Sequence, residues 1–209
     1  MLNRLRSGAT RVFTPIAMFL LRRGVSPDAV TVAGTLGVVV AALWLFPTGH
    51  LLAGTLVIAV LVLSDLVDGV MARASGRASA WGAFLDSTLD RLGDAAIFSG
   101  LLIHLAVQGH DATAVLALAC LVLGSVVPYA RARAEGLGMT ANVGIAERAD
   151  RLAAVLVATA AVGLGAPVAV LTVVLALLAV ASAVTVVQRM ATVRRQVAAT
   201  AARGEEPAA

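Results

Sequence analysis

Long apolar runs separated by short polar breaks dominate the chain. A helix needs about 20 predominantly apolar residues to cross a bilayer. Six runs reach or approach that length, at residues 29–46, 51–72, 83–107, 112–130, 152–164 with flanking residues, and 166–187. The breaks after the first, third and fifth runs contain the glycine, proline and aspartate residues typical of turns. Short connections favour antiparallel neighbours, so the pattern predicts an all-α integral membrane protein with six transmembrane helices.

Residues 1–24 follow a different pattern, in which apolar residues recur at helical spacing and arginines occupy other positions. The apolar set is Leu2, Leu5, Ala9, Val12 or Phe13, Ile16 and Leu20. This pattern predicts an N-terminal amphipathic helix that lies on the membrane surface. A signal peptide is the competing interpretation, but Arg22 and Arg23 follow the apolar stretch and no small-residue cleavage site does. We therefore expect a juxtamembrane helix over 1–24, a six-helix transmembrane domain over 25–195 and a flexible tail over 196–209.

Composition supports a membrane protein and excludes several other classes. Hydrophobic residues make up 60% of the chain and charged residues 13%, and the mean hydropathy is +0.94. Apolar dominance excludes a disordered chain, and the single cysteine, Cys120, excludes a disulfide scaffold. All 16 basic residues are arginines, and the net charge is +4. In a membrane protein this charge indicates orientation and lipid contact rather than nucleic-acid binding.

The arginines are confined to alternate connections between the apolar runs. They precede the first run, lie between the second and third and between the fourth and fifth, and follow the sixth; only Arg91 falls inside a run. Cytoplasmic segments hold the excess of positive charge in membrane proteins. We therefore expect a multi-pass protein of the cell membrane with both termini in the cytoplasm.

Four aspartates lie within the second and third apolar runs, namely Asp65, Asp68, Asp86 and Asp90. Carboxylates inside a membrane are costly and are candidates for function. The pairs are three and four residues apart, so each pair lies on one face of its helix. In an antiparallel hairpin all four would meet at one depth, on the order of 10 Å inside the cytoplasmic ends of these helices.

Four converging carboxylates need strong positive compensation. Several hard oxygen ligands suit Mg²⁺ or Mn²⁺ and can bridge a two-metal site. The alternatives are a proton or ion pathway in a transporter, such as a divalent cation transporter, and a set of buried structural salt bridges. Asp94, one turn further along, could pair with Arg91 or bind other polar groups.

The residues between the aspartates complete a longer motif, D-x2-D-G-x2-A-R-x8-G-x3-D-x3-D, from Asp65 to Asp90. This resembles the signature of the CDP-alcohol phosphotransferases, membrane enzymes that transfer a phosphatidyl-type group from a CDP-linked lipid to an alcohol. The resemblance implies CDP-diacylglycerol as donor and a homodimer. It also implies two divalent ions, Mg²⁺ or Mn²⁺, held by the four aspartates, with Asp90 as general base.

The same resemblance implies a set of CDP-lipid contacts: Asp28, Thr31, Gly69, Ala72, Arg73, Ser79 and Gly82. The three small residues of the motif would let the nucleotide approach the helix backbone, although small residues also serve tight helix packing. Arg73 would bind the diphosphate, or would simply anchor a helix end at the membrane interface. Asp28 and Thr31 would line the cytidine pocket, and the segment around them also has the features of a helix start.

An arginine cluster near the cytoplasmic side is suited to binding a phosphorylated acceptor. Its members are Arg131, Arg133, Arg148, Arg151, Arg189 and Arg194. The pattern R-A-R-A-E followed by G-I-A-E-R-x-x-R resembles the actinobacterial branch of the family that uses inositol phosphate, although lysine is common there at the position of Arg131. We therefore predict that the enzyme makes phosphatidylinositol phosphate and releases CMP. The alternatives are glycerol 3-phosphate as acceptor, as in phosphatidylglycerol phosphate synthase, and arginines that serve only orientation.

Overall fold

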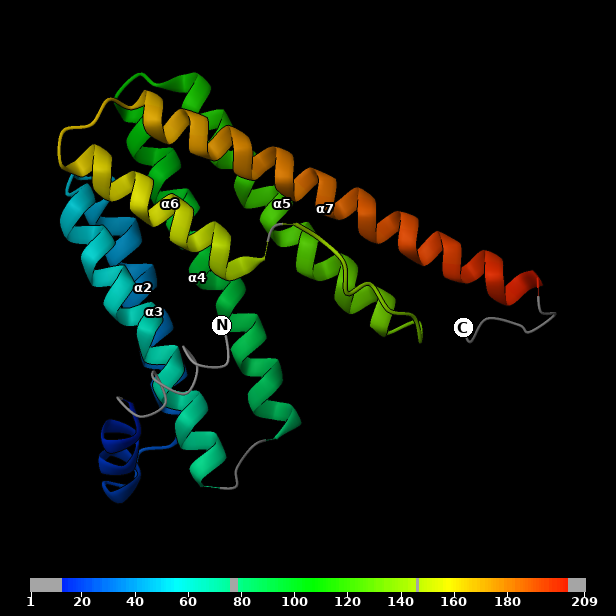
Figure 1. Ribbon diagram of the computed structural model, residues 1–209. Helices are drawn as coiled ribbons and strands as arrows, with labels where there is room; N and C mark the ends of the chain where they lie inside the picture. Colours follow the sequence, from blue (N-terminus) through cyan, green and yellow to red (C-terminus); the bar gives the residue numbers. More distant parts are fainter. Residues whose placement is uncertain (1–12, 76–78, 146, 203–209) are drawn as a thin grey trace. The chain divides into compact units, whose positions relative to one another are not determined.

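The computed structural model describes residues 13–75, 79–145 and 147–202, apart from the side chains of residues 64–66. Every regular element in this part of the chain is a helix, which confirms the all-α prediction (Figure 1). A short helix, Phe13–Arg22, precedes six longer ones. These are α2 (Pro27–Leu45), α3 (Leu51–Ala74), α4 (Ala80–Val107), α5 (Asp111–Glu135), α6 (Arg148–Gly163) and α7 (Ala169–Ala202). Each of the six predicted apolar runs coincides with one of the longer helices.

The chain forms two compact units, residues 1–100 and 101–209. In the first unit α2 and α3 pack side by side (Figure 1). Helix α4 packs against α2 at Gly100, where an added Cβ would lie only 2.2 Å from the carbonyl oxygen of Ala42. The short helix contributes the buried Ala17 to an apolar cluster with Val67 and Met71 of α3. The helix segments that carry the predicted motif therefore rest on a packed apolar base.

In the second unit α7 packs against both α5 and α6. Leu171 and Leu175 of α7 are fully buried. At the seam with α5 the hydroxyl oxygens of Thr113 and Thr172 are 2.8 Å apart, and the thiol of Cys120 donates to the carbonyl of Leu175. Cys120 is thus a buried residue of the packed interface between α5 and α7, as its apolar surroundings in the sequence suggest.

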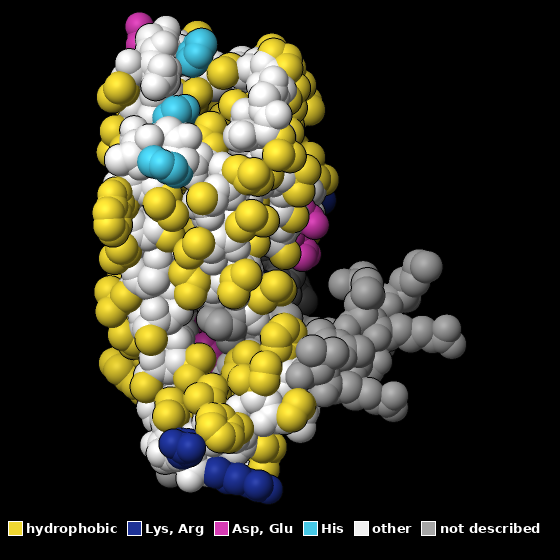
Figure 2. All heavy atoms as spheres, turned by 90° about the vertical axis from the view of Figure 1, so that its left-hand side faces the viewer, with side chains coloured by type: hydrophobic (Ala, Val, Ile, Leu, Met, Phe, Trp, Pro, Cys, Tyr) yellow, Lys and Arg dark blue, Asp and Glu magenta, His cyan; other side chains and the backbone are white. Residues whose placement is uncertain are grey.

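Four of the described helices, α2, α3, α5 and α7, are long and apolar enough to cross a membrane. Large hydrophobic side chains on these helices are exposed, such as Leu36, Val60 and Leu177. Figure 2 shows how widely such side chains cover one face of the molecule. A water-soluble protein rarely exposes so many large apolar side chains on its helices, whereas lipid favours them. The protein is therefore a membrane protein.

Two helices end well beyond the apolar runs that predicted them. Helix α5 continues through Pro128 to Glu135, because the loss of one backbone donor is tolerated in helices of this kind. Helix α7 continues to Ala202, into the segment predicted to be a flexible tail, because residues 197–202 are mostly alanine, the strongest helix former. Residues 1–12 of the predicted surface helix and residues 203–209 of the predicted tail lie outside the described part of the chain.

Candidate active site

The start of α2 presents the first two predicted site residues. The hydroxyl of Ser26 accepts a hydrogen bond from the backbone amide of Ala29, and Pro27 occupies the first turn, which together fix where the helix begins. Asp28 and Thr31 follow within the first turns of the helix. The segment is therefore a helix start, and its polar side chains also line a cleft.

A hydrogen bond joins this helix start to the aspartate motif. The hydroxyl of Thr31 donates to Oδ2 of Asp68 over 2.6 Å, between side chains that are 37 residues apart in the sequence. Asp68 is only 7% exposed and Thr31 only 8%. A buried carboxylate requires such donors, because it has lost its hydration. Thr31 thus holds Asp68 in one orientation at the edge of the cleft.

The last turns of α3 carry Gly69, Ala72 and Arg73. The Arg73 guanidinium folds back over Gly69, where an added Cβ would lie 3.5 Å from its Nη1. The chain then leaves the helix at Ser75, whose hydroxyl and amide both donate to the carbonyl of Met71. Arg73 is exposed and lines the cleft, where its planar guanidinium can donate several hydrogen bonds.

The start of α4 is capped by Ser79, whose hydroxyl accepts a hydrogen bond from the amide of Gly82 over 3.0 Å. Gly82 faces α2, since an added Cβ would lie 3.9 Å from Oδ1 of Asp28. Asp86 follows one turn later and Asp90 two turns later on the same helix. The capping bond therefore fixes where α4 begins, and Gly82 lies beside Asp28 of α2 at that start.

These three helix ends enclose a cleft of about 360 Å³ within the first unit. Its described lining consists of Pro27, Asp28, Thr31, Asp68, Gly69, Ala72, Arg73, Ser79, Gly82, Ala83 and Asp86. All seven residues predicted to contact the CDP-lipid are in this set, together with two of the four predicted metal ligands. Pro27 and Ala83 were missed by sequence reasoning, because neither has a side chain that signals chemistry.

Three carboxylates of the motif, those of Asp68, Asp86 and Asp90, lie near one another. Asp86 and Asp90 are close enough to Asp68 for their negative charges to repel it. Arg91 compensates part of this charge, with its Nη2 3.5 Å from Oδ2 of Asp90. The side chain of Asp65 lies outside the described part of the structure, and the described side chains alone form no metal-holding group of three or more. Two cleft-lining carboxylates and a third nearby are nevertheless the oxygen donors that Mg²⁺ and Mn²⁺ prefer.

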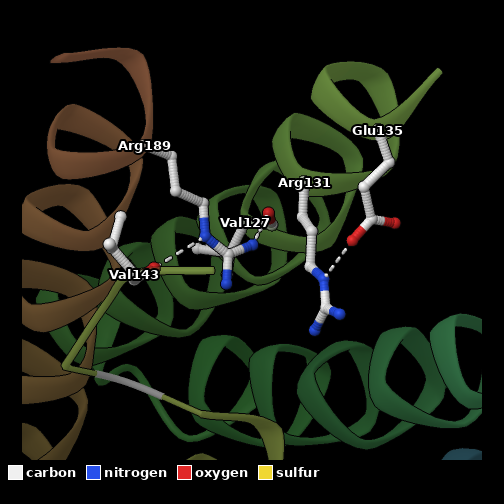
Figure 3. A network of polar contacts seen from close by, with 5 residues as sticks. All are labelled: Val127, Arg131, Glu135, Val143 and Arg189. Atoms are coloured by element: carbon white, nitrogen blue, oxygen red, sulfur yellow. Dashed lines mark hydrogen bonds and ion pairs between the residues drawn. The ribbon is translucent and has the colours of Figure 1, made fainter. Parts of the chain in front are cut away.

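The predicted acceptor arginines lie in the second unit, and the structure gathers three of them. Arg189 of α7 lies within electrostatic range of Arg131 and Arg151, and also of Glu135 and Glu147. Figure 3 shows Arg189 between α5 and the segment before α6, where its Nε donates to the carbonyl of Val143 over 3.0 Å and its Nη1 donates to the carbonyl of Val127. Arg131 pairs with Glu135 over 2.8 Å.

The remaining arginines differ in their surroundings. Arg151 of α6 is only 3% exposed and its guanidinium lies beside Gly124 of α5. Arg148 begins α6 and is partly buried, whereas Arg133 and Arg194 are exposed. The structure therefore brings together Arg131, Arg151 and Arg189, and gives no comparable contact for Arg133 or Arg194 within the described residues.

Comparison with known proteins gives a consistent result. Residues 24–148 match the CDP-alcohol phosphatidyltransferase family. The chain is 50% identical over 204 residues to the phosphatidylinositol phosphate synthase of Streptomyces avermitilis, covering 94% of this chain and 84% of that protein. It is 48% identical over 203 residues to the protein of the same name from Cutibacterium acnes, covering 93% and 98%.

Solved structures of a relative are also similar. The Mycobacterium tuberculosis phosphatidylinositol phosphate synthase with CDP-DAG bound has a TM-score of 0.84 and 44% identity, covering 88% of this chain and 94% of that one. The same protein in complex with manganese and citrate has a TM-score of 0.81 and 43% identity, covering 87% and 88%.

Proposed function

The chain belongs to the CDP-alcohol phosphatidyltransferase family, and we propose that it transfers the phosphatidyl group of CDP-diacylglycerol to inositol phosphate, releasing CMP and forming phosphatidylinositol phosphate. One observation carries the proposal. A single cleft collects all seven residues expected to contact the CDP-lipid from three helix ends, beside Asp68 and Asp86. The high identity to phosphatidylinositol phosphate synthases supports the choice of acceptor.

In this proposal the cleft binds the nucleotide end of the donor lipid. The small side chains at Gly69, Ala72 and Gly82 leave the helix backbone accessible to the cytidine and diphosphate. Arg73 binds the diphosphate, because its planar guanidinium matches phosphate oxygens in a bidentate manner. Asp28 and Ser79 offer polar atoms toward the cytidine.

We propose that Asp65, Asp68, Asp86 and Asp90 hold two divalent ions, Mg²⁺ or Mn²⁺. The complex of the mycobacterial relative with manganese supports a divalent site. When bound, the ions would neutralise the diphosphate and the charge that develops as the bond to CMP breaks. Thr31 has the separate role of orienting Asp68 through its hydrogen bond.

Asp90 takes the proton from the acceptor hydroxyl in this mechanism. The acceptor oxygen then bonds to the lipid-side β-phosphorus, the bond from that phosphorus to the bridging oxygen breaks, and CMP leaves with the electron pair. A single displacement needs no covalent nucleophile from the protein. Changing Asp90 to Asn should therefore abolish turnover while thermal stability stays close to that of the wild type. Retained CMP release in this variant would remove Asp90 from the role of base.

The arginines of the second unit are the proposed site for the acceptor phosphate. Arg131, Arg151 and Arg189 lie close enough to interact, and Glu135 and Glu147 offset only part of their positive charge. A phosphate dianion would relieve this repulsion and accept several charge-assisted hydrogen bonds. Arg133, Arg148 and Arg194 remain secondary candidates.

We also propose that the chain crosses the membrane six times, with α4 and α6 among the crossings and both termini in the cytoplasm. The placement of arginines supports this topology. Helix α4 has 28 residues, about 42 Å of helix, which is long enough to cross despite its charged residues. The family resemblance further suggests a homodimer in the plasma membrane.

Purified protein, CDP-diacylglycerol and Mg²⁺ test the proposal directly. Inositol 3-phosphate, glycerol 3-phosphate and free inositol are added separately, and CMP and lipid product are measured, with a chelator as the metal-free control. We expect turnover with inositol 3-phosphate alone, lost with chelator and restored by Mg²⁺ or Mn²⁺. Turnover with glycerol 3-phosphate alone would refute the acceptor but keep the reaction class. No turnover with any alcohol would refute the enzyme and favour a cation transporter.

A further inference from the structure

The connection between α5 and α6 is bound along the surface of α7. Helix α5 ends at a reversal in which Gly138, with a positive φ of 71°, lets the amide of Met139 reach back to the carbonyl of Ala134 over 2.9 Å. The chain then runs without regular structure through residues 140–145, which we call the returning segment. Its path is decided by polar side chains of α7, since it makes no helix or strand of its own.

Gln196 of α7 binds both backbone groups of Thr140. Its Oε1 accepts from the amide of Thr140 over 3.0 Å, and its Nε2 donates to the carbonyl of the same residue over 2.6 Å. A primary amide is suited to this double contact, because it carries a donor and an acceptor side by side. A carboxylate at the same position could accept but could not donate.

Two further α7 side chains bind the same segment. Nε of Arg189 donates to the carbonyl of Val143, and the hydroxyl of Thr185 accepts from the amide of Ile145 over 3.2 Å. Gly144 lies directly against Thr185, so that an added Cβ would be 2.4 Å from Cγ2 of the threonine. The glycine is therefore required for this close approach.

The spacing of these contacts has a simple geometric basis. Thr185, Arg189 and Gln196 span eleven positions of a helix, about 16 Å at a rise of 1.5 Å per residue. Their partners, Ile145 back to Thr140, span five positions of extended chain, also about 16 Å. An extended segment thus lies antiparallel along one face of α7, held at both ends and near its middle.

The returning segment connects the helix ends that carry the predicted acceptor arginines. Arg131 lies in the last turns of α5 before it, and Arg148 and Arg151 lie in the first turn of α6 after it. Arg189 itself binds the segment and the carbonyl of Val127 in α5. Two of the five N–H groups of Arg189 are used in these bonds, which leaves an edge of the guanidinium that can bind an oxyanion.

From this geometry we infer that Gln196 and Thr185 are positioning residues for the acceptor phosphate: by holding residues 140–145 along α7 they set the relative positions of Arg131, Arg151 and Arg189. The inference rests on the proposed function, because it assigns the acceptor phosphate to these arginines. Neither Gln196 nor Thr185 is among the described residues that line the proposed donor cleft in the first unit. Their effect should therefore fall on one substrate only.

The test measures steady-state kinetics of the full-length variants Gln196→Ala, Gln196→Glu and Thr185→Val with inositol 3-phosphate and CDP-diacylglycerol. We expect each variant to raise KM for inositol phosphate about tenfold, the loss expected for one well-placed hydrogen bond. KM for CDP-diacylglycerol and the melting temperature in detergent should change little. Gln196→Glu should be at least as defective as Gln196→Ala, because its carboxylate faces the Thr140 carbonyl without a donor. Val197→Ala, at the neighbouring exposed position, is the control and should match wild type.

Hydrogen exchange gives a second readout that does not depend on turnover. The Thr140 amide should exchange faster in both Gln196 variants and at the wild-type rate in Val197→Ala.

An unchanged KM for inositol phosphate in all three variants would overturn the inference, as would an equal rise in KM for both substrates. If wild type uses glycerol 3-phosphate instead, the proposed acceptor fails, and KM for that phosphate decides the positioning role in the same way. Wild-type protein inactive with every alcohol would refute the proposed function and this inference with it.

Discussion

The hydroxyl of Thr31 joins two motifs that are separate in the sequence. It belongs to the entry of α2, yet it donates to the carboxylate of Asp68 in α3 over 2.6 Å. A hydrogen bond to a buried charged group contributes about 1.5–3 kcal/mol to the free energy of unfolding. Because the proposed role of Asp68 depends on the direction of its oxygens, this one hydroxyl should affect catalysis as well as stability.

We expect Thr31→Val to lower kcat/KM for CMP release by about tenfold or more, since it removes the donor and keeps the shape of the side chain. Thr31→Ser keeps the hydroxyl and should retain most of the activity. The melting temperature of both variants in detergent serves as the check on folding. Equal activity in Thr31→Val and wild type would show that Asp68 needs no such support.

Small residues let the helices of the first unit approach one another. Gly100 of α4 lies against the backbone of α2, where an added Cβ would be 2.2 Å from the carbonyl oxygen of Ala42. Gly93, two turns earlier on the same helix, would place a Cβ 3.7 Å from a methyl group of Val38, an ordinary van der Waals distance. Packing of α4 against α2 therefore depends on Gly100 far more than on Gly93.

These two glycines form a matched pair for a stability experiment. Gly100→Ala should destabilise the protein by about 1–3 kcal/mol, because a backbone carbonyl cannot move aside as a flexible side chain can. Gly93→Ala should be neutral or slightly stabilising, since alanine is favoured over glycine within a helix. Thermal or denaturant unfolding in detergent measures both. Equal stability of the two variants would contradict the observed close approach at Gly100.

At the scale of the whole molecule, the number of membrane crossings decides on which side each connection lies. Helix α6 has only 16 residues, and α4 carries charged residues within its length, so neither meets the criteria that α2, α3, α5 and α7 satisfy. Only the alternation of arginines along the chain indicates that all six cross. Labelling of single cysteines from one side of the membrane can distinguish these topologies.

We expect cysteines at Thr48 and Gln108 to be labelled from outside the cell and a cysteine at Ala202 only from inside, each in a Cys120→Ala background. Opposite exposure of Thr48 and Gln108 would mean that one of the two helices between them, most simply α4, does not cross. Exposure of Gln108 and Ala202 on the same side would mean that one of the three helices between them, most simply α6, does not cross.

Local patterns predicted much of the architecture and several residues that line the cleft of the first unit. Apolar runs located the six long helices, because the length and periodicity of a helix are recorded in consecutive residues. The spaced motif identified Gly69, Ala72, Arg73 and Gly82, and all four line one cleft. The flexible tail was predicted to begin at residue 196, but the alanine-rich residues before Ala202 extend α7.

Contacts between distant segments were decided only by the tertiary structure. The sequence placed Arg189 among phosphate-binding candidates, but its bonds to the carbonyls of Val127 and Val143 could not be foreseen. Gln196 carried no motif at all, although it binds Thr140 from 56 residues away. Spacing along one helix follows from its 3.6-residue period, whereas a contact between two segments depends on how their backbones pack, and neither segment records that by itself.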